Sequence, residues 1–147
     1  MNQPLPGLSH DFFESILDSI AEHIVVIDRY GVILYVNRPW VEFAIANGLG
    51  APQWIGENYL YACDRAVKSG DISAGAAADS IKSVINDANL VTNFEYPCHS
   101  PNEQRWFSMR TCAFAASETY LISHQNITDR KLAEDRIREL TSSKNQN

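Results

Sequence analysis

The sequence predicts an α+β fold, in which an antiparallel five-stranded sheet carries its helices on one face. Two strand-like segments come first, helical segments fill the middle of the chain, and three strand-like segments follow before a final helix. Short connections join the strands as hairpins, which makes neighbouring strands antiparallel. Because helices and strands occur in separate groups, the class is α+β rather than α/β.

The composition fits a single domain with a hydrophobic core. The chain has 147 residues, and 45% of them are hydrophobic. Residues 1–8 are expected to form a flexible lead-in, and residues 9–128 the folded domain with its N-terminal flanking helix. Residues 129–140 predict a C-terminal output helix, and the polar residues 141–147 a disordered tail.

The first elements follow from capping and turn residues. Ser9 is placed to cap the N-terminal helix. Strands are predicted at 24–28 and 32–37, with Gly31 in the turn between them, and Pro39 is suited to the first turn of the next helix.

The middle of the chain predicts helices and a loop. Residues 56–63 are expected to form short helical turns, and the polar, glycine-bearing residues 64–75 a loop. An apolar stripe at helical spacing predicts a long helix over 76–89.

Three segments then alternate between apolar and polar residues, at 91–98, 104–115 and 120–127. This period of two is typical of strands with one buried face. The last strand runs directly into the output helix, where side-chain oxygens can accept hydrogen bonds from the first helical N–H groups. In that helix Ala133, Ile137 and Leu140 form a short coiled-coil-like seam.

Charge and cysteine content exclude several classes of function. The net charge is −6 and no basic stripe occurs, so we expect no nucleic-acid binding. Cys63, Cys98 and Cys112 are an odd number without C-x-x-C spacing, which fits a reducing, cytoplasmic location. There is no signal-peptide pattern and no apolar run near the ~20 residues of a membrane span, so we expect no membrane partner.

No motif indicates catalysis. The sequence lacks G-x-S-x-G, H-E-x-x-H and a glycine-rich phosphate loop, and no pair of carboxylates has a spacing that implies acid–base chemistry. We therefore expect a protein that is not an enzyme. A small isomerase-type enzyme is the least favoured alternative.

Several motifs resemble those of PAS sensory domains. Residues 24–37 resemble the PAS opening I-x-V-x-D-x-x-G-x-I-x-x-x-N, residues 55–56 the following I-G turn, and residues 105–110 the fourth strand of bacterial sensory boxes. Residues 126–131 resemble the exit motif D-I-T-[ED]-R-K, with Asn126 in place of the usual Asp. The resemblance covers about residues 12–138.

The resemblance implies a bacterial PAS signalling module, either stand-alone or excised from a longer protein. Such a module binds a small ligand or a partner, and its C-terminal helix acts on a histidine kinase of a two-component system, a diguanylate cyclase or a transcription regulator. The residues expected to transmit the signal are Asn126, Thr128, Asp129 and Arg130. We also expect a homodimer through the flanking helices. The main alternative is a ligand-free dimerisation module with a filled core.

The resemblance leaves the cofactor unknown and disfavours haem and flavin. Tyr59 stands where the flavin-binding light-oxygen-voltage subclass has its reactive cysteine, and Phe107 and His124 stand at that subclass's two polar flavin contacts. The predicted helix at 76–89 lacks the histidine that holds haem in the oxygen-sensing subclass. Haem through His99 or His124 stays open.

Alternation and the resemblance together predict a ligand pocket. Its expected lining is Tyr35, Phe43, Tyr59, Cys63, Phe94, Phe107, Met109, Ile122 and His124. A pocket imidazole at His124 could bind an acidic or hydroxylated ligand or act as a pH switch. The simpler interpretation, which we favour, is a core histidine bonded to a backbone carbonyl or a neighbouring tyrosine. For Cys63 we favour a small buried hydrophobe over a reactive thiol.

Overall fold

The computed structural model describes residues 9–47, 54–114 and 118–145, so the predicted lead-in at 1–8 lies outside the described residues. The elements in chain order are α1 (His10–Ser19), β1 (His23–Asp28), β2 (Ile33–Val36), α2 (Arg38–Ala46), α3 (Tyr59–Lys68), α4 (Ile72–Asn86), β3 (Val91–Pro97), β4 (Trp106–Phe114), β5 (Thr119–Asn126) and α5 (Thr128–Asn145).

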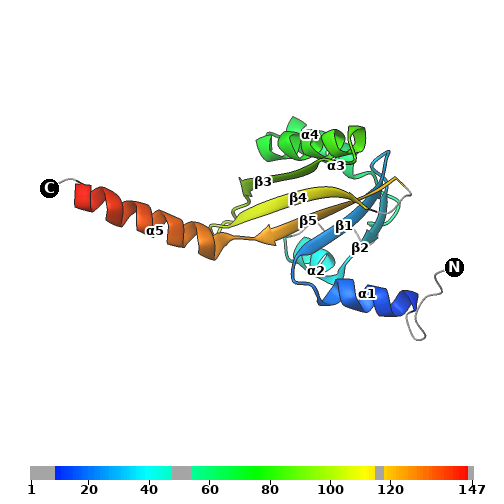
Figure 1. The fold of residues 1–147 in the computed structure, drawn as a ribbon, viewed down its shortest axis with the longest axis horizontal. Helices are drawn as coiled ribbons and strands as arrows, with labels where there is room; N and C mark the ends of the chain where they lie inside the picture. The colour runs from blue at the N-terminus through cyan, green and yellow to red at the C-terminus, as the bar shows by residue number, and fades with distance from the viewer. Residues whose placement is uncertain (1–8, 48–53, 115–117, 146–147) are drawn as a thin grey trace.

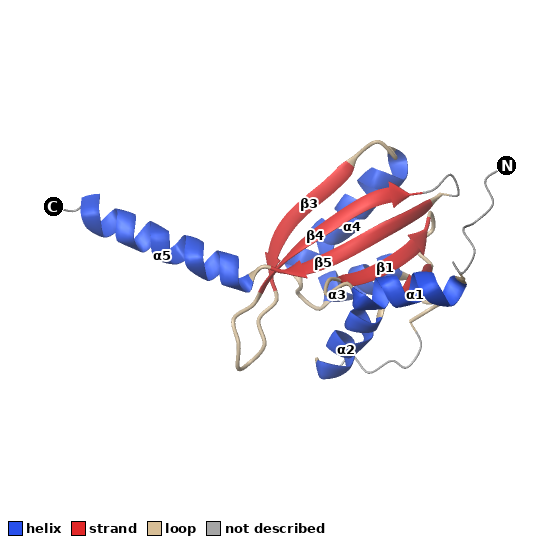
Figure 2. Ribbon diagram, turned by 60° about the horizontal axis from the view of Figure 1, so that its bottom comes forward, coloured by secondary structure: helices blue, strands red, loops and turns tan. Residues whose placement is uncertain are grey.

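The five strands form one antiparallel sheet, as predicted, and their order is β2-β1-β5-β4-β3 (Figure 1). The helices α3 and α4 lie behind the strands in Figure 2, and their apolar residues pack on the sheet. The centre of this core consists of residues that are almost fully buried: Val25, Ile27, Ile81, Val84, Met109 and Ile122. The class is therefore α+β with the helical layer on one face.

Side-chain caps start four of the helices. The side chains of Ser9, Asn37, Asn58 and Asp71 each accept a hydrogen bond from a backbone N–H in the first turn of the helix that follows. Such caps satisfy N–H groups that have no partner within the helix. The prediction that Ser9 caps α1 is confirmed.

The loop predicted at 64–75 is wrong. The helix α3 continues to Lys68 and α4 begins at Ile72, so the connection is short. Two features missed in the sequence explain this result. Asp71 caps α4, and Gly70 has a positive φ of 99°, which suits glycine and turns the chain sharply between the two helices.

The pairing of β1 with β2 contains a register shift. Val26 pairs with Tyr35, but the next residue, Ile27, pairs with Ile33, so β2 carries an extra residue at this point. A bulge of this kind moves the following side chains to the opposite face of a sheet. Consequently Ile33 and Val36 face the core, whereas Tyr35 does not.

The last helix is longer than predicted. The residues 141–145, expected to be disordered, continue α5 to Asn145, and only 146–147 lie outside the described residues. No glycine or proline interrupts 128–145, and the Thr141 hydroxyl donates to the carbonyl of Ile137 at 2.9 Å. Figure 1 shows α5 projecting away from the sheet. In the described part of the chain, no helix is both long and apolar enough to cross a membrane.

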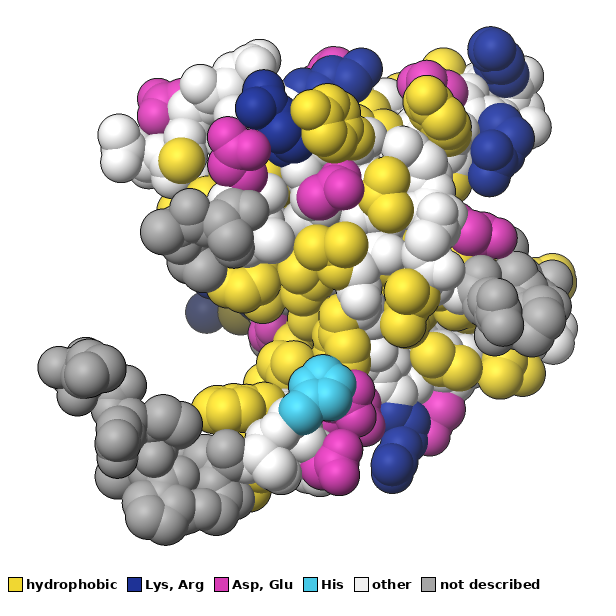
Figure 3. Space-filling view, turned by 90° about the vertical axis from the view of Figure 1, so that its right-hand side faces the viewer, with side chains coloured by type: hydrophobic (Ala, Val, Ile, Leu, Met, Phe, Trp, Pro, Cys, Tyr) yellow, Lys and Arg dark blue, Asp and Glu magenta, His cyan; other side chains and the backbone are white. Residues whose placement is uncertain are grey.

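The N-terminal helix α1 leaves its apolar side open. It has no buried residue, and the rings of Phe12 and Phe13 are 44% and 52% exposed. Figure 3, which views the molecule from the right-hand side of Figure 1, shows hydrophobic side chains at the surface of this side. The helix is nevertheless fixed to the domain, since the buried Asn37 donates to the Leu17 carbonyl at 3.0 Å.

Candidate functional site

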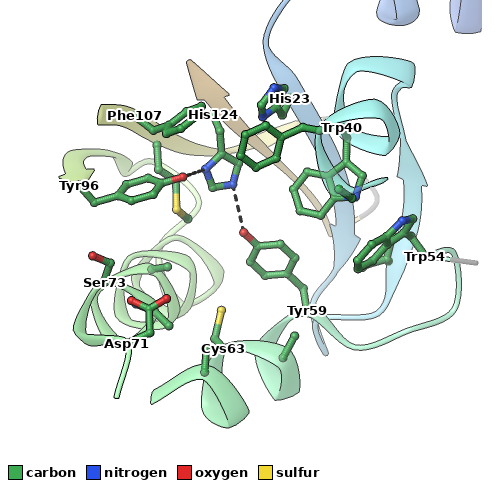
Figure 4. A pocket seen from close by; sticks show the side chains of 18 of the residues that line it. His23, Trp40, Trp54, Tyr59, Cys63, Asp71, Ser73, Tyr96, Phe107 and His124 are labelled. Carbon is green, nitrogen blue, oxygen red and sulfur yellow. Dashed lines mark hydrogen bonds between the residues drawn. The ribbon is translucent and has the colours of Figure 1, made fainter. Parts of the chain in front are cut away.

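A cavity of about 550 Å³ lies between the sheet and helices α2, α3 and α4 (Figure 4). Side chains of every strand and of these three helices contribute to its wall. Most of the predicted pocket residues line it, namely Phe43, Tyr59, Cys63, Phe94, Phe107, Met109 and His124. The sheet alternation therefore identified the face on which the cavity opens.

Tyr35 does not belong to this cavity. The bulge between β1 and β2 turns its ring away from the core, and its hydroxyl donates to the Asp18 carboxylate of α1 at 3.2 Å. Burial and this carboxylate together raise the pKa of Tyr35 to about 12. The residue holds α1 against the sheet instead of lining a pocket.

Ile122 also lies outside the cavity wall, although it faces the correct side of β5. It is fully buried and belongs to the core cluster that packs under α4. Its neighbours across the sheet are Val25 and Thr111, both fully buried. The prediction gave the right face, but this part of the face is filled.

His124 lies at the centre of the polar part of the cavity, between two tyrosines (Figure 4). The Tyr59 hydroxyl is 3.1 Å from His124 Nε2, and the Tyr96 hydroxyl is 2.7 Å from Nδ1. Bonds to neighbouring tyrosines are what the simpler interpretation of His124 expects. However, the same three side chains also line the cavity.

Burial keeps this polar cluster uncharged. Burial, reinforced by nearby His23, lowers the pKa of His124 to about 4, so the imidazole is neutral at pH 7. Burial likewise raises the pKa of Tyr59 and of Tyr96. The cavity therefore contains hydrogen-bonding groups without formal charge.

Aromatic rings form the apolar wall, and the sequence analysis missed several of them. Trp40 and Trp54 contact edge to face with ring centroids 5.8 Å apart, and the ring of Trp40 lies 5.9 Å from that of Tyr59. His23 packs on Phe43 at 4.5 Å. Trp40 follows the Asn37 cap by three residues, which was a usable signal for its position. Nothing local in the sequence indicates that Trp54 reaches the cavity.

A backbone connection fixes Tyr59 relative to the sheet. The N–H of Tyr59 donates to the Gly31 carbonyl, and the N–H of Ile33 donates to the Glu57 carbonyl, each at 2.8 Å. The segment before α3 thus pairs with the outer side of β2. Gly31 has φ 93°, and a Cβ there would lie 2.8 Å from Asn58 Oδ1, so glycine is required for this close approach.

Charged residues occur on the part of the lining contributed by α3 and the start of α4. Arg65 and Asp71 lie there and are exposed, and Asp71 also caps α4. Cys63 is buried, and burial raises the pKa of its thiol to about 11, which keeps it protonated and weakly nucleophilic. Within the described residues, no cluster of three or more His, Cys, Asp or Glu side chains could hold a metal ion.

The predicted transmission residues lie where β5 leads into α5. Asn126 Oδ1 accepts hydrogen bonds from the Thr128 N–H at 3.0 Å and from the Thr128 hydroxyl at 2.6 Å. The Thr128 hydroxyl in turn accepts the N–H of Trp106 in β4 at 3.1 Å. The first residue of α5 is thereby bonded to both of the last two strands.

Ion pairs add a connection from α5 to β3 that the sequence analysis did not predict. Glu95 pairs with Arg130, and with Lys131 at 2.7 Å. Glu95 lies between Phe94 and Tyr96, both of which line the cavity. By contrast, Asp129 is exposed, and its side chain has no hydrogen bond or ion pair with any described residue.

Comparison with known proteins gives a distant relative and fold neighbours. No protein-family model matches the chain. An uncharacterized 104.1 kDa protein in the hypE 3′ region of Rhodobacter capsulatus is 36% identical over 121 residues. The match covers 78% of this chain and 12% of that protein, so the chain spans about an eighth of the relative's length.

Two solved structures are similar in their backbone. The PAS domain of Bordetella pertussis BvgS has a TM-score of 0.55 at 16% identity, covering 90% of this chain and 96% of that one. The PAS domain of the Cronobacter turicensis quorum-sensing receptor RpfR, in complex with C12:0, has a TM-score of 0.51 at 21% identity. That match covers 75% of this chain and 97% of the receptor domain.

Proposed function

We propose that this chain, which has the PAS fold, is a sensory module that binds a small molecule in its cavity and signals through α5. The single observation that carries the proposal is the cavity itself, which stays open at about 550 Å³ although aromatic side chains line it. Its mostly apolar wall with a few convergent polar groups is typical of small-molecule sites, whose volumes are roughly 300–1,000 Å³.

The alternative of a filled-core dimerisation module requires the aromatic side chains to close the cavity. Phe94, Tyr96 and Phe107 instead form part of its wall. Dimerisation itself remains part of the proposal, because Ile137 and Leu140 on α5 are 64% and 60% exposed. An exposed apolar seam on a projecting helix favours pairing with a second helix. We therefore propose a homodimeric sensory module.

For signal transmission we propose a shift between two arrangements of β5 and α5. A ligand that contacts His124 acts on the strand that ends at Asn126, and Asn126 binds the first residue of α5. A ligand that contacts Tyr96 acts on β3, where the neighbouring Glu95 pairs with Arg130. A ligand with different affinity for the two arrangements would change their populations.

The partner that we propose is an effector on which α5 acts, linked in the same chain or bound as a separate protein. A kinase, a diguanylate cyclase or a transcription regulator would fit this role. The PAS fold supports it, since the similar RpfR domain belongs to a quorum-sensing receptor. The 104.1 kDa relative supports a setting in which such a domain is one part of a longer protein.

The first test is an absorption spectrum and a native mass spectrum of the protein purified from cells, followed by thermal-shift screening of a metabolite panel. We expect extra bound mass or a raised Tm with at least one compound, because binding to the folded state stabilises it. A haem or flavin band would identify the ligand directly and would correct the expectation against those cofactors.

A cavity-filling variant then locates the binding site. Ala74→Phe adds a ring at a residue of α4 that lines the cavity, and it should abolish the thermal shift while the protein stays folded. Ala76→Phe places the same ring at an exposed position of the same helix and should leave the shift unchanged. Equal responses of the two variants would contradict binding in this cavity.

A further inference from the structure

The tyrosine–histidine–tyrosine cluster has a fixed number of protons, and this number limits what it can offer to a ligand. A neutral imidazole has one N–H donor and one acceptor nitrogen. Because both nitrogens of His124 are within bonding distance of a tyrosine oxygen, one tyrosine must donate its O–H to His124 and the other must accept the imidazole N–H. The tyrosine that accepts keeps its own O–H proton for another partner.

The two distances favour one assignment of the tyrosine that keeps its proton. Bonds donated by a hydroxyl are typically about 2.7–2.8 Å long, whereas bonds donated by N–H are about 2.9–3.0 Å. The Tyr96 oxygen lies 2.7 Å from Nδ1 and the Tyr59 oxygen 3.1 Å from Nε2. This difference corresponds to Tyr96 donating to Nδ1 and His124 donating from Nε2 to Tyr59. With this assignment the Tyr59 O–H is available to a molecule in the cavity, since no other described residue accepts it.

Formal charge around the cluster does not favour an anion. His124 is neutral, and its neighbour His23 has a pKa lowered by burial. Among the described residues of the lining, the Lys or Arg side chain is that of Arg65, which is exposed and accompanied by the carboxylates of Glu57 and Asp71. A carboxylate placed beside Tyr59 would lose its water shell without gaining a buried cation, and burial of an unpaired charge is costly.

We propose that the cavity takes an uncharged molecule with a flat apolar body and a hydrogen-bond acceptor, such as a carbonyl oxygen or a ring nitrogen, to which Tyr59 donates. The flat body contacts the rings of Trp40, Trp54 and Phe43, which form the apolar wall. This inference rests on the proposed function, because it names the class of ligand for the same cavity.

The first experiment measures the tautomer of His124 by long-range ¹H–¹⁵N NMR on the ligand-free protein, with the signal assigned by its loss in His124→Gln. We expect the Nε2–H form. In Tyr96→Phe, which removes the donor to Nδ1, the His124 signals should move more than in the exposed control Tyr61→Phe. The Nδ1–H form would overturn the assignment of Tyr59 as the free donor.

The second experiment compares three probes with one ring system by titration calorimetry: naphthalene-2-carboxamide, 2-naphthoate and naphthalene. The amide has a neutral acceptor, the carboxylate is charged, and naphthalene has neither. We expect the amide to bind up to about tenfold more tightly than naphthalene, since a hydrogen bond contributes at most roughly that factor. The amide should also bind more tightly than 2-naphthoate, whose charge would be buried without a partner. Tyr59→Phe should remove the preference for the amide over naphthalene, whereas Tyr61→Phe should keep it.

The outcomes separate this inference from the proposed function. Binding of 2-naphthoate as tightly as the amide would overturn the uncharged class and still support a ligand cavity. Equal preference for the amide in the wild type and Tyr59→Phe would overturn the donor role of Tyr59. Failure of all three probes, together with no thermal shift across the metabolite panel, would overturn the inference and the proposed function alike.

Discussion

Ile122 and His124 are two residues apart on the same face of β5, yet they lie in different surroundings. Ile122 is packed under α4 in a closed core, whereas His124 lines a cavity of about 550 Å³. One strand therefore passes from a filled half of the domain to an open half. Alternation along the strand determines which face a side chain occupies, but the helices above that face determine whether the space is filled.

The largest expected effect on stability comes from a substitution in the filled half, the core under α4. Ile122→Ala should lower the free energy of unfolding by about 2–5 kcal/mol, because it leaves a hole in a close-packed region. Urea unfolding measures the change, and Leu132→Ala at a 49% exposed position of α5 is the control, with a change near zero. A small loss at Ile122 would mean that the core under α4 is not well packed.

The second prediction concerns the open half and the dependence of its stability on pH. The pKa of His124 is lowered from 6.5 to about 4 in the folded chain, so between these values the unfolded chain binds a proton that the folded chain does not. The free energy of unfolding should therefore fall as the pH falls through this window, by on the order of 3 kcal/mol.

The control for this pH dependence is His124→Gln, which cannot titrate and should show a shallower slope in urea unfolding between pH 7 and 4. His23 changes in the same direction, since burial lowers its pKa, so His23→Gln separates the two contributions. A slope unaffected by both substitutions would contradict burial of neutral imidazoles in this half.

The third prediction compares the halves on one helix. Ala78 belongs to the closed core, whereas Ala74 lines the cavity one turn earlier on α4. Ala78→Phe should destabilise the protein by about 1–3 kcal/mol through overpacking, and Ala74→Phe should cost clearly less, because space is available for its ring. Equal losses of Tm in the two variants would contradict an open cavity.

The smallest effect concerns the connection to α5. Arg130→Ala removes a partly exposed ion pair with Glu95 and should lower stability by less than about 1 kcal/mol. Hydrogen exchange in the first turn of α5 should nevertheless become faster, with ligand affinity unchanged. Arg136→Ala, which removes an exposed cation of the same helix that has no ion pair with a described residue, is the matched control. A loss of ligand affinity in Arg130→Ala would contradict a role in transmission alone.

Sequence patterns, together with the resemblance to PAS domains, predicted the fold and part of the cavity wall, because alternation along a strand depends on local periodicity. The three alternating strands put Phe94, Phe107 and His124 on the face where the cavity lies. The exceptions have physical causes. The prediction for Tyr35 was wrong because a one-residue bulge turns its side chain to the other face of the sheet. The prediction for Ile122 was wrong because α4 packs over it and fills the space.

The remaining errors have two causes, namely local signals that were missed and contacts between distant parts of the chain. The loop predicted at 64–75 replaced the end of α3 and the start of α4, because the cap at Asp71 and the turn at Gly70 were missed. Trp54 lines the cavity, and no local pattern in the sequence indicates this position. The pairing of Tyr59 and Tyr96 with His124 joins residues 65 and 28 positions apart.

The pairing of residues 56–59 with β2 also affects how the domain behaves in a crowded solution. The hydrogen bonds from this segment to Gly31 and Ile33 occupy backbone groups that an edge strand would otherwise present to other chains. In the described part of the chain, β3 is then the sheet edge that stays unpaired. Only its end is protected, where Pro97 lacks an N–H to donate. Aggregation by strand addition should therefore begin at β3 rather than at β2.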